Sequence, residues 1–162
     1  MTRKASFPPV AAPDARVLIL GSLPGERSLA AGRYYAHPQN QFWRLLSPVV
    51  GADLPALNYD ARIVAVQAAG IALWDVIASA DRAGSTDAAI RNPAGNDLVN
   101  LLARLPWLRA VAFNGGTALR LGRPLLAGQD IAILPLPSSS PLHTIAVTAK
   151  QPAWNTIIDH LR

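Results

Sequence analysis

Residues 16–25, RVLILGSLPG, decide the fold of this chain. The first half is a short run of mostly branched apolar side chains that ends at Gly21, which is typical of a strand buried on both faces of a parallel sheet. The second half, Gly21–Gly25, holds two glycines and a proline and predicts a tight turn whose backbone N–H groups can face an anion or a polar edge. This turn matches neither G-x-G-x-x-G nor a P-loop, so it gives little support for dinucleotide or nucleoside triphosphate binding.

Three further apolar runs repeat this strand pattern, and helical patterns lie between them. The runs are Ile71–Ile77 (IALWDVI), Arg109–Asn114 (RAVAFN) and Ile131–Leu136 (IAILPL). The alternation predicts an α/β fold with three layers, α/β/α, around a central four-stranded and mainly parallel sheet. The predicted helices cover residues 41–50, 59–69, 96–105, 117–121 and 152–161, with Pro152 in the first turn of the last one.

The length of 162 residues fits one domain, which we place at residues 15–162 after an irregular N-terminal arm at residues 1–14. Residues 80–95 are polar and predict a loop, with or without a short helix. Every unusual loop follows a predicted strand: residues 22–40, 75–92, 114–116 and 137–143. Because ligands of parallel sheets bind beyond the carboxyl ends of the strands, we expect these loops to converge on one cleft.

Composition narrows the functional classes. With 51% hydrophobic and 15% charged residues the chain is not of the disordered class, and its apolar stretches are too short and interrupted for a membrane span. The chain has no cysteine, which excludes disulfides, thiolate nucleophiles and cysteine-based clusters. The first residues lack the apolar core of a signal peptide, so we expect a cytoplasmic protein, and we expect a monomer.

The net charge of +5 comes almost entirely from arginine, since Lys4 and Lys150 are the only lysines. Arginine forks onto phosphate better than lysine does, and a basic surface favours polyanions such as nucleic acid. GC-rich coding explains the same arginine excess equally well, so charge alone leaves both interpretations open.

Residues 34–43, YYAHPQNQFW, gather aromatic and amide side chains around one proline. Phe42 and Trp43 open a predicted helix, and we expect them in its core-facing stripe. Tyr34 and Tyr35 precede that helix in a loop, where an aromatic ring can stack on a base or simply pack. Asn40 sits where the loop becomes a helix, so an N-cap is its simplest role. Two other tryptophans, Trp107 and Trp154, are predicted to be buried or half-buried.

Five segments in this order resemble the uracil-DNA glycosylase superfamily, in particular its hypoxanthine (deoxyinosine) branch and next the mismatch-specific uracil/thymine enzymes. The segments are GSLPG, YYAHPQNQFW, GIALWDV at residues 70–76, FNG at residues 113–115 and PSSSPLH at residues 137–143. The resemblance implies a base-excision repair enzyme that binds DNA without a cofactor, flips out a deaminated base and hydrolyses its N-glycosidic bond, leaving an abasic site.

The resemblance also assigns residues of the first half of the site. Relatives usually carry a catalytic Asp or Asn directly before the proline of the first motif, where this chain has Leu23, which cannot polarise water. The hypoxanthine branch places its catalytic Asn at the position of Asn40. Tyr35 falls where relatives stack an aromatic ring on the flipped base, and Asp75 falls where uracil enzymes read the base edge. The predicted base pocket comprises Gly21, Ser22, Leu23, Tyr35 and Asn114.

The second half of the resemblance concerns the Ser/Pro loop. Leu142 takes the place of the apolar wedge that fills the gap left by a flipped base, and such wedges are apolar side chains inserted between base steps. Ser138 stands where some relatives have a catalytic His. We expect the loop to contact DNA phosphates through its polar groups, including His143. The predicted wedge and phosphate contacts are Ser138, Ser139, Ser140, Pro141, Leu142 and His143.

The chemistry fits Asn40 and Asp75 as the catalytic pair. An amide does not accept a proton near neutral pH, so Asn40 can only orient a water through its carbonyl oxygen. Asp75 can accept a hydrogen bond from N1–H of hypoxanthine as a carboxylate, or donate to the ring when burial keeps it protonated. Whether Asn40 or Asp75 positions the water stays open. No lysine lies in the loops, which predicts hydrolysis without the covalent chemistry of a lyase.

Other functions remain open at this point. A uracil glycosylase acting on G/U mismatches shares the resemblance, and xanthine is a further deaminated base. The loss of catalytic residue types at Leu23 and Ser138 leaves room for a non-catalytic damage-binding protein on the same fold. A hydrolase of free nucleosides is the weakest alternative, since it has no use for a wedge loop. No His and carboxylate pair has metal-ligand spacing, so we expect no metal.

Overall fold

The computed structural model describes residues 3–162. Its centre is a four-stranded sheet in the order β3-β2-β6-β7, and all neighbouring pairs run parallel. The strands are β2 (Val17–Gly21), β3 (Ile71–Asp75), β6 (Ala110–Asn114) and β7 (Ala132–Leu136). The VLILG part of the predicted strand, after Arg16, therefore forms an inner strand that is buried along its whole length between β3 and β6. This confirms the predicted fold class.

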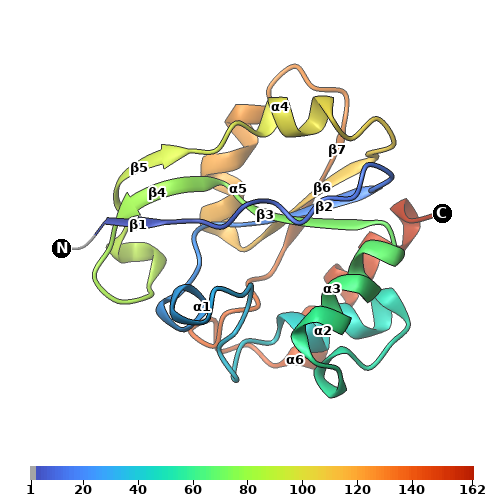
Figure 1. Ribbon diagram of the computed structural model, residues 1–162, viewed down its shortest axis with the longest axis horizontal. Coiled ribbons are helices and arrows are strands. Elements are labelled where there is room, and N and C mark those ends of the chain that lie inside the picture. Colours follow the sequence, from blue (N-terminus) through green and yellow to red (C-terminus); the bar gives the residue numbers. More distant parts are fainter. Residues whose placement is uncertain (1–2) are drawn as a thin grey trace.

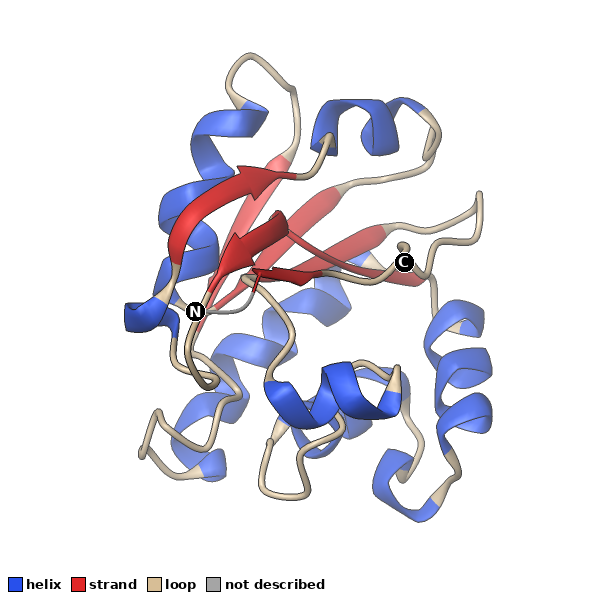
Figure 2. Ribbon diagram, turned by 60° about the vertical axis from the view of Figure 1, so that its left-hand side comes forward, coloured by secondary structure: helices blue, strands red, loops and turns tan. Residues whose placement is uncertain are grey.

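Helices cover both faces of this sheet, as Figures 1 and 2 show. On one face lie α2 (Phe42–Val50), α3 (Tyr59–Ala68) and α6 (Val147–Asn155), and on the other α4 (Leu98–Ala103) and α5 (Gly116–Gly122). A short helix α1 (Glu26–Ala31) follows β2. The 3₁₀ helices are η1 (Leu54–Ala56), η2 (Asp87–Ala89), η3 (Arg123–Leu126) and η4 (Thr156–His160).

Two apolar cores hold the layers together, one on each face of the sheet. Because successive side chains of a strand point to opposite faces, Ile19 packs with Phe42 and Trp154 on the α2/α6 side. Leu18 and Phe113 pack on the α4/α5 side. The cores confirm that Phe42, Trp43 and Trp154 are buried, whereas Trp107 is 61% exposed and the prediction of its burial was wrong.

A second, antiparallel sheet escaped prediction. It has the order β1-β4-β5, with β1 (Arg3–Ala5), β4 (Ile77–Asp81) and β5 (Arg91–Gly95). The predicted single strand at residues 71–77 is in fact split, because the chain leaves the central sheet at Val76 and enters the second one at Ile77. All of β5, RNPAG, is exposed and it contains a proline and a glycine, so it lacks the apolar alternation that would have marked a strand.

The N-terminal segment, predicted to be irregular, contributes structure to both sheets. Its β1 pairs with β4, and Val10 exchanges two backbone hydrogen bonds with Leu73 at the outer edge of β3. The segment therefore covers an edge that would otherwise leave strand donors unpaired. Its Phe7 and Pro8 carbonyls also accept side-chain hydrogen bonds from Trp74 and Tyr34, at 2.9 and 2.8 Å.

Helix boundaries show two further differences. The loop at residues 22–40, predicted to be irregular, contains α1. The last helix begins at Val147, so Pro152 lies inside α6 rather than in its first turn. A proline favours the first turn of a helix because its missing N–H costs least there, but here the helix continues through it. The remaining predicted helices begin and end within two residues of those observed.

Candidate active site

A cleft of about 540 Å³ opens at the carboxyl ends of the central strands. Three of its lining residues, Gly21, Asp75 and Asn114, are the last residues of β2, β3 and β6. The rest of the lining comes from α1 and from the segments that follow β2, β4 and β7. The predicted loop at residues 114–116 contributes Asn114, so all four predicted loops reach the cleft, which confirms that they converge. The cleft takes in every residue predicted for the base pocket and for the Ser/Pro loop, together with Asn40 and Asp75.

The floor of the cleft depends on the absence of a side chain at Gly21. A Cβ there would stand 2.7 Å from the Asp75 carboxyl oxygen Oδ1 and 3.1 Å from the Tyr35 hydroxyl. Both polar groups therefore close over the end of β2. Tyr35 takes a positive φ of 53°, an uncommon conformation for a residue with a bulky side chain. Such strain concentrates at sites where the surrounding structure holds a side chain for a purpose.

Asp75 is the buried acid of the cleft, with 3% of its surface exposed. Its second carboxyl oxygen, Oδ2, has no hydrogen-bond partner in the described part of the chain. Burial, and next the nearby negative charge of Asp87, raises the pKa of Asp75 to about 7, against a partly compensating effect of Arg82. Asp75 can therefore exist near neutral pH both as an acceptor and as a donor.

Asn40 lines the same cleft, where the loop meets α2. Its side-chain oxygen Oδ1 accepts from the backbone N–H of Phe42 at 3.0 Å, so the expected capping contact is present, although Gln41 is the N-cap residue by backbone geometry. An amide oxygen has two lone pairs, so this contact leaves one for a water molecule. Asn40 thus combines a structural contact with access to the cleft.

The two tyrosines differ. Tyr34 is 4% exposed, its ring meets Phe7 edge to face and its hydroxyl bonds the Pro8 carbonyl, which is ordinary packing. Tyr35 lies flat on Phe42, with ring centroids 3.7 Å apart and planes 8° apart. Burial, together with the Asp75 charge, raises the pKa of the Tyr35 hydroxyl, so that hydroxyl stays protonated near neutral pH. Tyr35 is the tyrosine whose hydroxyl stands beside Asp75 over Gly21.

The GSLPG turn is held from outside by a buried arginine. Arg82, 1% exposed, donates to the backbone carbonyls of Leu23, Pro24 and Gly84. Ser22 donates to Asp87 at 2.7 Å, which ties the same turn to the loop after β4. Leu23 itself is buried beside Ile77 and Ala80, so its side chain serves packing.

Asn114 and Ser139 anchor the start of the Ser/Pro loop. The Asn114 side chain donates to the Ser139 hydroxyl and accepts from the Ser139 N–H, both at 2.9 Å, and Gln41 N–H donates to the Ser139 carbonyl. Further along the loop Leu142 is 62% exposed at the rim of the cleft. His143 lines the cleft as well, and its Nδ1 is buried without a partner among residues 3–162.

Sequence reasoning missed three residues around the cleft. Asp87 lines it beside Ser85 and Thr86, although no motif assigned it a role. Arg82 and Lys150, both buried, hold the backbones of two motif loops. Hydrophobic periodicity marks buried apolar residues and does not show that a charged side chain is buried. The one available sign was a lysine or arginine that stands among apolar residues. His37 accepts from Gln39 N–H at 3.1 Å and supports its own loop.

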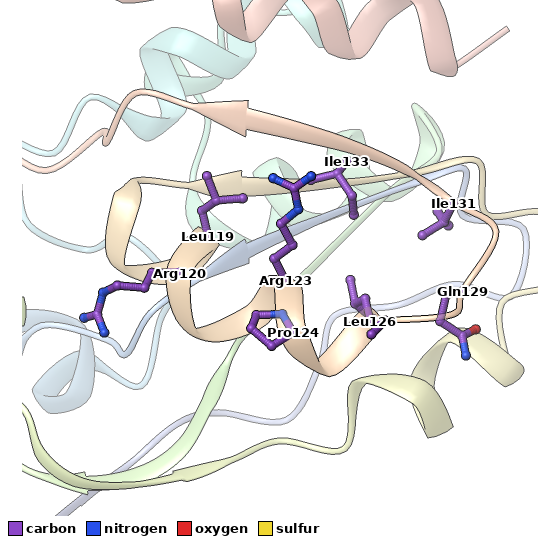
Figure 3. Close-up of a pocket in the computed structure, with 9 residues that line it drawn as sticks. Leu119, Arg120, Arg123, Pro124, Leu126, Gln129, Ile131 and Ile133 are labelled. Carbon is purple, nitrogen blue, oxygen red and sulfur yellow. The ribbon is translucent and has the colours of Figure 1, made fainter.

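A second cavity, of about 520 Å³, lies away from these residues (Figure 3). It is bounded by α5, η3 and the edge strand β7, and apolar side chains such as Leu119, Leu126 and Ile133 line it beside Arg120 and Arg123. It holds no carboxylate or histidine, so acid–base chemistry has no group there. In the part of the chain that the structure describes, no three His, Asp or Glu side chains gather as a metal site. None of the helices within residues 3–162 has the length and apolar character that a membrane span requires.

The chain is similar to known proteins over nearly its whole length. Residues 8–162 match the family model described as the uracil DNA glycosylase superfamily. A Methanosarcina barkeri protein named hypoxanthine DNA glycosylase is 36% identical over 152 residues, which cover 94% of this chain and 96% of that protein. A Methanosarcina acetivorans protein of the same name is 34% identical and covers 97% of this chain and 99% of its own length.

A solved structure agrees with the sequence comparisons. The solution NMR structure of a Methanosarcina acetivorans protein, described as a candidate uracil DNA glycosylase, superposes with a TM-score of 0.89 at 34% identity, covering 99% of both chains. The match includes the strands and loops that form the cleft, since so little of either chain is left out. On its sequence, its fold and the convergence of its motif loops, this chain belongs to the uracil DNA glycosylase superfamily.

Proposed function

We propose that the protein is a monofunctional DNA glycosylase that excises hypoxanthine from DNA. One observation carries the proposal: the cleft joins a buried acid with a free oxygen, Asp75, to the amide of Asn40 and to a rim that exposes Leu142. Two relatives that share more than a third of their residues with this chain are named for that activity. A small-molecule site would have no need of the exposed apolar rim.

Asn40 is suited to place the attacking water. Its Oδ1 is fixed by the Phe42 N–H, so the remaining lone pair points in a constant direction. In the hydrolysis, the water oxygen bonds to C1′ of the deoxyribose, the C1′–N9 bond breaks, and its electron pair leaves with the base. The base takes up one proton, and the water proton is lost to solvent. An amide does not take that proton, so Asn40 contributes orientation and dipole rather than base catalysis.

Asp75 is suited to hold the base. Its unpartnered Oδ2 can accept from N1–H of hypoxanthine when ionised, and the neutral acid can donate to a ring acceptor. A donor to the departing base stabilises the negative charge that develops there. Tyr35, whose hydroxyl stands near the same carboxyl, gives the base an aromatic and polar wall. Asp75 and Tyr35 can both approach the end of β2 because Gly21 has no side chain there.

The rim explains how a base in a duplex reaches the floor. A base must leave the stack before a glycosylase can act on it, and an apolar side chain can fill the gap. Leu142 is exposed at the tip of the Ser/Pro loop, while the serine backbone behind it is anchored through Asn114 and Gln41. Ser138, Ser140 and His143 then offer polar groups toward phosphates.

The reaction should stop at the abasic site. The residues that line the cleft include no lysine, and an amine nucleophile is what covalent lyase chemistry requires. Leu23 is apolar and cannot polarise water at the first motif, where uracil enzymes usually do so. We therefore propose hypoxanthine before uracil as the excised base. We also propose that the protein is a monomer and that it acts in the cytoplasm.

A panel of labelled duplexes tests the proposal. Each carries one deoxyinosine, deoxyuridine or deoxyxanthosine, and excision is scored as alkali-labile strand breaks under single-turnover conditions. We expect the fastest excision from the deoxyinosine duplex, no breaks before alkali treatment and no covalent adduct after borohydride. Preference for a G/U duplex would favour the uracil alternative, and an adduct would overturn the monofunctional assignment.

A further inference from the structure

Lys150 is a fully buried lysine that the chemistry above does not use. It lies in the second turn of α6 with no exposed surface. Its ammonium donates to the Ser138 carbonyl at 2.6 Å and to the His143 carbonyl at 2.9 Å. These two carbonyls stand at the two ends of the Ser138–His143 loop. Burying an ammonium is costly, and it is tolerated where charge-assisted hydrogen bonds compensate.

The two halves of this loop are held in different ways. The first half is tied to the rest of the protein through Ser139, which Asn114 and Gln41 contact. In the second half, Leu142 N–H and His143 N–H donate only to Ser140, within the loop itself. Among residues 3–162, the bond from Lys150 to the His143 carbonyl is the one hydrogen bond that ties this half to another element.

We infer that Lys150 is a positioning residue for base flipping: from beneath the loop, it fixes the carbonyls on either side of Leu142, so that the exposed side chain is presented rigidly to the duplex. The inference rests on the proposed function, because it assumes that Leu142 is a wedge. Without the two hydrogen bonds from Lys150, the loop would have to become ordered each time Leu142 inserts, and the entropy lost in that ordering would oppose flipping. Desolvation lowers the pKa of Lys150, which agrees with an ammonium enclosed under the loop.

The test compares Lys150→Met with Lys150→Arg. Methionine keeps the length and apolar stem of lysine but removes the donors, whereas arginine keeps charge and donors. Leu101→Ala, in the core on the α4 face, supplies a control that loses stability far from the loop. Single-turnover excision is measured on duplex and on single-stranded deoxyinosine substrates, because a base in a single strand is already unstacked.

We expect Lys150→Met to slow excision from the duplex by roughly tenfold or more, the factor that corresponds to losing a charge-assisted hydrogen bond, and to slow excision from the single strand far less. Lys150→Arg should recover part of the duplex rate. Leu101→Ala should leave the ratio of the two rates unchanged. If Lys150→Met lowers both rates equally, Lys150 has only a structural role and the inference fails.

A second readout does not depend on activity. Amide hydrogen exchange at Leu142 and His143 should be faster in Lys150→Met than in the wild type, with the amides of β2 unchanged. Unchanged protection at both positions would overturn the inference. If Lys150→Met does not fold, Lys150→Gln, which removes the charge and shortens the reach to the loop carbonyls, takes its place in both assays, with a smaller effect of the same pattern expected. A wild type that excises no base overturns the proposed function instead, while the exchange data still decide whether Lys150 orders the loop.

Discussion

At the scale of single residues, the site is built from groups whose surroundings change their ordinary behaviour. Asp75 is an acid near neutrality because it is enclosed, and Asn40 holds one lone pair ready because the other is occupied. The resemblance named both residues from the sequence. It could not foresee the contacts of Asp75, because burial and the positions of Asp87 and Arg82 depend on the path of the chain through the second sheet.

The raised pKa of Asp75 predicts how stability depends on pH. A folded-state pKa of about 7, above the ordinary value of 3.8, means that the folded protein binds this proton more tightly than the unfolded chain. The contribution of Asp75 is therefore fully present below about pH 4 and is lost as the pH rises through 7. Asp75→Asn removes this dependence.

We expect the melting temperature of Asp75→Asn to gain on that of the wild type as the pH rises from 4 to 8. Thermal denaturation at a series of pH values measures it, with exposed Asp130→Asn as the control. Parallel curves for Asp75→Asn and the wild type would show that Asp75 has no raised pKa in the folded protein.

The capping contact of Asn40 makes its two roles separable. Asn40→Ala should lose about 1 kcal/mol of stability through the lost bond to Phe42 N–H, and about 100-fold or more in single-turnover excision if the amide orients the water. Asn58→Ala is the matched control, since Asn58 caps α3 through Ala61 N–H and does not line the cleft. Excision that falls no further in Asn40→Ala than in Asn58→Ala would leave Asn40 as a cap alone.

At the scale of elements, the sequence predicted the central sheet and most helices because their apolar periodicity is strong. It did not predict β1, β4 and β5 as a sheet, since β1 and β5 carry few apolar residues and β1 pairs with a strand far along the chain. It placed the start of α6 too late because Pro152 imitates a start signal. The local sequence pattern thus predicted strands that are buried, and it missed strands that are exposed or that depend on backbone pairing with a distant segment.

The Ser/Pro loop is the element whose prediction is sharpest. Leu142→Ala removes the apolar filler and should weaken flipping by about 1–3 kcal/mol, the scale of a lost stacking contact. Because Leu142 is 62% exposed, the melting temperature should hardly change. Val64→Ala on α3, where the side chain is 65% exposed and outside the cleft, is the control. A strong loss of melting temperature with normal excision would place Leu142 in the core and refute the wedge.

At the scale of the whole molecule, the charge of +5 predicts binding driven largely by phosphates. If two phosphates are neutralised, raising the salt from about 50 to 200 mM should weaken DNA affinity roughly tenfold, and more contacts give a steeper loss. Fluorescence anisotropy with a labelled duplex measures the slope. At saturating enzyme the excision rate should stay nearly constant, since salt acts on binding and not on the bond that breaks.

The most direct test of the central claim is a product balance. A duplex with one deoxyinosine is incubated with excess wild-type protein, and mass spectrometry follows both the free base and the strand. We predict free hypoxanthine and an intact strand with one abasic site in equal amounts, with both absent when Asn40→Ala replaces the wild type for the same time. Binding of the duplex with no released base would contradict the account and would identify a damage-binding protein on a glycosylase fold.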